Sequence, residues 1–116
     1  MSELSKQQNK QLRQIASMAH ERELGKVLSE LGSAFDRWEN DEVSARELND
    51  RILELDRGAL KQIWDKYQRL PAETVVAQGI SEGFVQESEV PAEILDHLRK
   101  QIQFFSDEMA RNDKER

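Results

Sequence analysis

The fold is decided by residues 24–48, which read LGKVLSELGSAFDRWENDEVSAREL. In the first part of this stretch, large apolar residues recur at spacings of 4, 3, 4 and 3, at Leu24, Leu28, Leu31, Phe35 and Trp38. These spacings place all five side chains on one face of a helix, where they are expected to pack in the core. The apolar pattern stops near Asn40, so we expect this helix to end there.

A second helix is expected to begin at Ala45. Ser44 is a suitable N-cap, because its hydroxyl can accept the N–H of Glu47 while the Glu47 carboxylate reaches back to the N–H of Ser44. Val43 and Leu48 stand at the positions of a hydrophobic staple. The apolar face continues through Leu48, Ile52, Leu55, Ala59, Ile63, Tyr67 and Leu70. It passes Gly58, where the helix either kinks or breaks. Together the two helices predict an antiparallel helical hairpin.

The rest of the chain predicts a later pair of helices. Pro71 ends the preceding helix and opens a new one over about residues 72–82, with Gly83 after its last turn. Pro91 opens a last helix with apolar residues at Leu95, Leu98, Ile102, Phe105 and Met109. No segment alternates with period two, so no strand and no β-sheet are expected. The sequence therefore predicts an all-α protein of four to five helices.

The 116 residues fit a single domain better than two. Residues 1–20 are polar and Gln-rich, and we expect a flexible or helical extension there. Residues 21–110 are expected to form one helical domain, and residues 111–116 a solvated tail. Leu12, Ile15 and Ala19 follow a different helical phase from the stripe that starts at Leu24, so the apolar seam is expected to rotate or break near residues 20–23.

Composition excludes several classes of function. The chain has no Cys, which removes disulfides, thiolate metal sites and cysteine nucleophiles. The net charge of -6 opposes binding to nucleic acid. The chain start shows no secretory leader and no membrane-spanning run, so a cytoplasmic protein is expected. His20 and His97 stand in no catalytic or metal-binding spacing. We expect no enzyme and no cofactor, while a small enzyme holding a metal in its acidic segment is a third interpretation.

Residues 36–47 resemble the loop of an EF-hand calcium site. Asp36, Asn40 and Glu47 fall at loop positions 1, 5 and 12, between two helices placed as in that motif. Trp38 stands at position 3, where an oxygen ligand is expected, and Asp41 at position 6, where Gly permits the turn. The alternative function is therefore a degenerate EF-hand-like, calcium-responsive module with Asp36, Asn40 and Glu47 as metal ligands.

The net charge is concentrated in residues 71–98, which contain six acidic and no basic side chains. Within this segment, the loop from Phe84 to Val90 is apolar at both ends and acidic between them. We expect Glu87 and Glu89 to steer a cationic protein partner that Phe84 or Val85 anchors. The long apolar stripes also predict a homo-oligomer. The expected function is therefore a non-catalytic helical module for protein–protein interaction or regulation that self-associates, without nucleic-acid or membrane partners.

Overall fold

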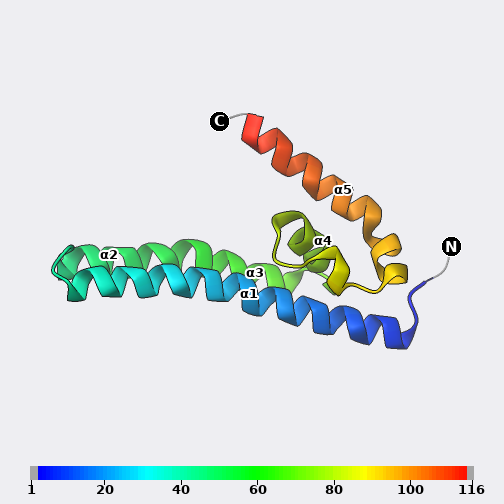
Figure 1. Cartoon of the computed structure of the whole chain (residues 1–116), viewed down its shortest axis with the longest axis horizontal. Helices are drawn as coiled ribbons and strands as arrows, with labels where there is room; N and C mark the ends of the chain where they lie inside the picture. The colour runs from blue at the N-terminus through cyan, green and yellow to red at the C-terminus, as the bar shows by residue number, and fades with distance from the viewer. Residues whose placement is uncertain (1–2, 115–116) are drawn as a thin grey trace. The chain divides into compact units, whose positions relative to one another are not determined.

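The computed structural model describes residues 3–114, and over that range the chain is all-α, with no strand (Figure 1). The elements are α1 (Lys6–Glu39), α2 (Ala45–Leu55), the π-helical turn η1 (Asp56–Leu60), α3 (Lys61–Arg69), α4 (Ala72–Glu82), the 3-10 turn η2 (Glu87–Glu89) and α5 (Ala92–Lys114). Because η1 joins α2 to α3 without a break, these three form one long helix, and the described chain contains four helices. The predicted all-α fold of four to five helices is confirmed.

The chain divides into two compact units. The hairpin unit is His20–Arg69, and the terminal unit combines the residues up to Ala19 with those from Leu70 onward. These boundaries differ from the expected extension over 1–20 and domain over 21–110, because α1 is continuous and its beginning packs with the later helices. Of the expected tail, residues 111–114 are exposed and belong to α5, whereas residues 115–116 lie outside the described range.

The predicted change of apolar phase in α1 coincides with the boundary between the units. Leu12, Ile15 and Ala19 are buried in the terminal unit. Beyond residue 20, Ala34 is the buried residue of α1. Since the helix is unbroken from Lys6 to Glu39, the seam rotates and does not break. Of the two states expected for the first twenty residues, the structure has the helical one from Lys6 onward.

The hairpin unit has the predicted antiparallel arrangement, with α2 and α3 returning along the second half of α1 (Figure 1). Glu30 of α1 pairs with Arg51 at 3.6 Å, while the earlier Glu23 pairs with the later Lys66 at 2.6 Å. Earlier residues of α1 thus meet later residues of the returning helix, which is the pattern of an antiparallel pair.

The end of α1 is closed by two backbone hydrogen bonds. The N–H of Glu42 donates to the carbonyl of Arg37 at 2.8 Å, and the N–H of Asp41 donates to the carbonyl of Trp38 at 3.0 Å. This is a Schellman motif, in which the residue after the cap adopts a left-handed conformation. Asp41 has that conformation, with φ of 59°. The chain reversal therefore uses an aspartate where glycine is the usual residue.

The start of α2 is at Ala45, as predicted. The Ser44 hydroxyl accepts the N–H of Glu47 at 3.1 Å, which is the expected N-cap bond. The second half of the capping box differs from the expectation. The Glu47 carboxylate receives the Ser44 hydroxyl at 3.4 Å, so the two side chains of the box contact each other.

Gly58 lies within the π-helical turn, and the helix continues through it. The apolar residues on this side are spaced by four at Leu55, Ala59 and Ile63. In an ordinary α-helix, repeated spacings of four drift around the axis, because one turn takes about 3.6 residues. The wider π turn absorbs the extra residue and keeps Leu55 and Ile63 buried.

The terminal unit contains the predicted later helical pair, in which α4 packs against α5. Its fully buried core includes Leu12, Val76, Ala77, Ile94 and Leu98. A Cβ added to Gly79 would stand 3.5 Å from side-chain atoms of Ala19 and Val85. Gly83 ends α4 in the left-handed conformation, with φ of 87°, as its position predicts.

Candidate functional site

The hairpin unit carries an open groove of about 670 Å³ between α1 and the segment from η1 into α3. Its apolar lining residues are Leu24, Leu60, Ile63 and Trp64, and its polar ones are His20, Asp56, Arg57, Lys61 and Asp65. We call it the hairpin groove. Three of its lining residues belong to η1, so the π turn that keeps the core in register also shapes the groove.

The apolar surface of the hairpin unit extends beyond the groove. Trp64 is 62% exposed, and Leu28 is 50% exposed. Phe35 and Trp38 are each 40% exposed, which corrects the expectation that they pack in the core. Two helices bury only the sides that face each other, so the flank of a wide apolar stripe stays in contact with water.

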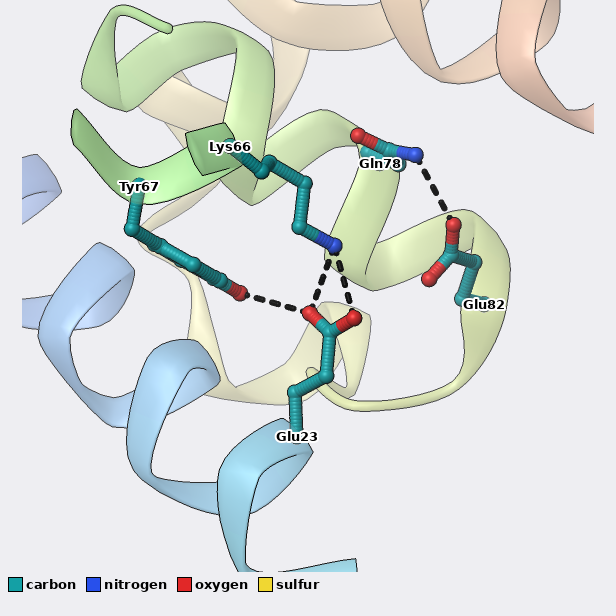
Figure 2. A network of polar contacts seen from close by, with 5 residues as sticks. All are labelled: Glu23, Lys66, Tyr67, Gln78 and Glu82. Atoms are coloured by element: carbon teal, nitrogen blue, oxygen red, sulfur yellow. Dashed lines mark hydrogen bonds and ion pairs between the residues drawn. The ribbon is translucent and has the colours of Figure 1, made fainter. Parts of the chain in front are cut away.

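A polar cluster of Glu23, Lys66 and Tyr67 ties α1 to α3 (Figure 2). The Glu23 carboxylate accepts Lys66 Nζ at 2.6 and 2.8 Å and the Tyr67 hydroxyl at 3.0 Å. The side chains of Lys66 and Glu23 are only 16% and 15% exposed. His20, which lines the groove, stacks on the Tyr67 ring with centroids 4.2 Å apart. We call Glu23, Lys66 and Tyr67 the Glu23 cluster.

Sequence reasoning missed the Glu23 cluster, although a signal was present. Glu23 precedes Val27 by four residues, and Val27 precedes Leu31 by four, so the carboxylate lies on the inner side of α1. A carboxylate on a buried face needs a cation or hydrogen-bond donors from the facing helix. Lys66 and Tyr67, at the matching end of the hairpin, supply them.

The residues of the predicted calcium loop serve the turn between α1 and α2. Asp36 lies within α1, where its carbonyl accepts the N–H of Asn40 at 3.0 Å. Glu47, the expected bidentate ligand, contacts Ser44. Within residues 3–114, no group of three or more His, Cys, Asp or Glu side chains is placed to hold a metal ion. The calcium alternative stays a prediction, and capping explains the positions of Ser44 and Glu47 without an ion.

In the predicted partner-facing loop of residues 84–90, some side chains are buried or hold the loop itself, and others are accessible. Val85 is only 2% exposed and packs against its own unit, so it is not available to anchor a partner. Glu89 accepts the N–H of Gln86 at 2.9 Å and so holds its own turn. Glu87 lies 3.6 Å from Arg99 in an exposed pair, and Phe84 is half-buried. A role for this loop in binding stays a prediction, with Phe84 and Glu87 as its accessible residues.

Other carboxylates of the acidic segment also have partners in their own unit. Glu73 lies 3.1 Å from His97, and Glu93 accepts the side-chain amide of Gln8 at 2.6 Å. Glu82 accepts the amide of Gln78 at 2.9 Å (Figure 2). The concentration of negative charge in residues 71–98 is therefore partly used to pack the terminal unit.

No family model, curated protein or solved structure matches this chain. Among residues 3–114, no helix combines the length and apolar character that crossing a membrane requires. The hairpin groove and the exposed apolar side chains of the same unit are therefore the features that bear on function.

Proposed function

We propose that this chain is a non-catalytic protein-interaction module whose hairpin groove receives an amphipathic helix. The observation that carries the proposal is Trp64, which is 62% exposed at the edge of the groove. A tryptophan gains more from burial than other side chains, and tryptophans are enriched among the residues that dominate binding energy. Leu24, Leu60 and Ile63 line the same groove. They form an apolar surface against which the apolar face of an amphipathic helix can pack.

The charges around the groove suit a helix with charges of both signs. Arg57 and Lys61 stand near Asp56 and Asp65 among the lining residues. Such a rim selects the register of a bound helix more than it raises affinity. A polyanion would meet both carboxylates, and the net charge of -6 also opposes it. The proposal therefore names a protein partner, with neither nucleic acid nor membrane, and places the module in the cytoplasm.

The proposal assigns no catalytic role to the Glu23 cluster, because its side chains already bond to one another. The Glu23 carboxylate accepts three hydrogen bonds from Lys66 and Tyr67. A general base or nucleophile needs a free position within hydrogen-bond reach of substrate. These groups instead hold the two helices of the hairpin together, and no cofactor is part of the proposal.

Site-specific photo-crosslinking tests the proposal. A benzophenone amino acid is placed at position 64 of the full chain in the producing cells, and at position 62 as a control, because Gln62 is exposed on the same helix but does not line the groove. We expect a discrete protein adduct from position 64 and none from position 62. Equal labelling from both positions, or no adduct from either, would remove the groove as the binding surface.

A further inference from the structure

Helix α1 carries a second exposed apolar feature next to the groove. Gly25, Leu28, Gly32 and Phe35 follow one another at spacings of 3, 4 and 3, which places them on one strip of the helix. Leu28 is 50% and Phe35 is 40% exposed. Apart from its chain neighbours and the backbone of its own helix, a Cβ added to Gly25 or Gly32 would meet no atom of the described residues within 4 Å. We call these four residues the glycine seam, in which large and small residues alternate.

Gly25 and Gly32 lower the stability of α1, and packing within the hairpin unit does not explain why glycine stands at these positions. Each glycine in a helix interior costs about 1 kcal/mol relative to alanine. At Gly79 the close approach of Ala19 and Val85 accounts for a small residue. At Gly25 and Gly32 no atom beyond the chain neighbours and the helix's own backbone comes within 4 Å of an added Cβ, so the small residues leave two open hollows on either side of Leu28.

We propose that the glycine seam pairs with the same seam of a second copy, with the two α1 helices antiparallel. This inference goes beyond the proposed function, because it concerns a different strip of α1 from the hairpin groove. With the two-fold axis near Glu30, Leu28 lies opposite Gly32 of the second copy. Gly25 then lies opposite Phe35 of the second copy. Every large residue of the seam therefore meets a hollow, as knobs-into-holes packing requires.

The residues that flank the seam are complementary in the same arrangement. In an antiparallel pair, the residues on one side of the seam lie next to the residues on the same side of the seam of the second copy. Arg22 then lies opposite Asp36 of the second copy, and the two-fold axis forms this pair twice. Both residues are exposed in the chain. On the other flank, Leu24 lies opposite Trp38 of the second copy. Flanking charge pairs of this kind set the orientation of paired helices.

A parallel pairing lacks these features. It places Gly25 and Gly32 opposite themselves, which leaves voids, and it places Leu28 and Phe35 opposite themselves, which forces the helices apart. In the parallel pairing, no basic residue beside the seam of one copy lies next to an acidic residue beside the seam of the other copy. The alternation of large and small residues therefore favours the antiparallel dimer.

The ends of the seam limit the affinity. Glu21 lies opposite Glu39 of the second copy, so like charges meet at both ends and oppose association. The seam from residue 21 to residue 39 is about 27 Å long at 1.5 Å per residue. A contact of that length is small beside a standard protein interface, so we expect a dissociation constant of about 10 μM.

Charge reversal distinguishes the two orientations. In the antiparallel dimer, Glu21→Lys places a lysine opposite Glu39 at both ends, which should lower the dissociation constant about fivefold in sedimentation equilibrium. In a parallel dimer Glu21 would face Glu21 of the second copy, so Glu21→Lys would exchange one like-charge pair for another and leave the constant unchanged. Glu42→Lys makes the same charge change outside the seam and should leave the constant unchanged. Equal effects of Glu21→Lys and Glu42→Lys would overturn the proposed geometry.

An exchange of large and small residues tests the packing. Gly32→Leu fills the hollow and should raise the dissociation constant at least about tenfold, although leucine favours the helix more than glycine does. The double variant Leu28→Gly with Gly32→Leu restores a large residue opposite a small one and should recover dimerisation. It contains the same number of glycines, so circular dichroism should show unchanged helicity. Failure of the double variant to recover the dimer would overturn the seam pairing.

The inference and the proposed function fail separately. A wild-type chain that remains monomeric at about 100 μM, ten times the expected dissociation constant, would overturn the antiparallel dimer. The benzophenone adduct at position 64 would still be expected in that case, because the groove is lined from η1 and α3 as well as α1. Conversely, a dimer that dissociates with Gly32→Leu supports the seam even where position 64 gives no adduct.

Discussion

Replacing Lys66 by methionine should destabilise the hairpin unit by about 2 kcal/mol. Methionine keeps much of the apolar stem of lysine but removes the ammonium that donates to both oxygens of Glu23 at 2.6 and 2.8 Å. The carboxylate then keeps only the Tyr67 hydroxyl in this cluster. Exposed ion pairs contribute about 0.2–1 kcal/mol, whereas breaking a buried pair costs about 3–5 kcal/mol. Side chains that are 16% and 15% exposed fall between these limits.

Urea unfolding followed by tryptophan fluorescence measures this effect. Both tryptophans of the chain, Trp38 and Trp64, lie in the hairpin unit, so the signal reports the unfolding of that unit. Arg51→Met is the matched control, because Arg51 pairs with Glu54 at 2.8 Å and with Glu30 at 3.6 Å, while the side chains of Arg51, Glu54 and Glu30 are 38%, 69% and 50% exposed. We expect the control to change the free energy of unfolding by less than about 0.5 kcal/mol.

A double-mutant cycle separates the pair from other effects of the substitution. Adding Glu23→Leu to Lys66→Met removes the unpaired carboxylate from its covered position, so the double variant should be more stable than Lys66→Met alone. The reasoning is refuted if Lys66→Met costs no more than Arg51→Met. A coupling energy of zero in the cycle would refute it equally.

Three further substitutions test the ends of the helices. Asp41→Gly should stabilise the hairpin unit by up to about 1 kcal/mol, because Asp41 has a φ of 59°; an unchanged urea midpoint in the tryptophan signal would contradict this. Ser44→Ala should cost about 1 kcal/mol through loss of the N-cap bond, and calcium should leave the melting temperature of the wild type unchanged. A calcium-dependent rise that Glu47→Gln abolishes would favour the EF-hand-like alternative. Gly83→Ala should destabilise the terminal unit by about 1–2 kcal/mol, measured by circular dichroism, because its φ is 87°.

The helices and most of their ends could be predicted from the sequence because they depend on near neighbours. The start of α2 at Ala45 follows from Ser44 and Glu47, which are three residues apart. The starts of α4 and α5 follow from the two prolines, and the end of α4 from Gly83. Capping bonds and proline geometry act within one helical turn, so the residues that decide them are adjacent in the sequence.

The π turn and the polar cluster were beyond sequence reasoning because they depend on a facing helix. Gly58 alone indicates weakness in a helix, and the sequence does not show that the helix continues through it as a π turn. Glu23 looks like an ordinary surface carboxylate until Lys66, 43 residues later, is placed beside it. The candidate groove is lined from both helices, so its residues could not be assembled from periodicity.

The sequence by itself determined that this protein is all-α, where most of its helices begin and end, and that its chain reverses near Asp41. Periodicity, caps and helix-breaking residues contain that information locally. Only the tertiary structure decided which part of each apolar stripe is buried. Leu28, Phe35 and Trp38 share the spacing of Leu24 and Leu31, yet they stay at least 40% exposed. The physical reason is that a stripe wider than the contact between two helices is covered only where the second helix lies against it.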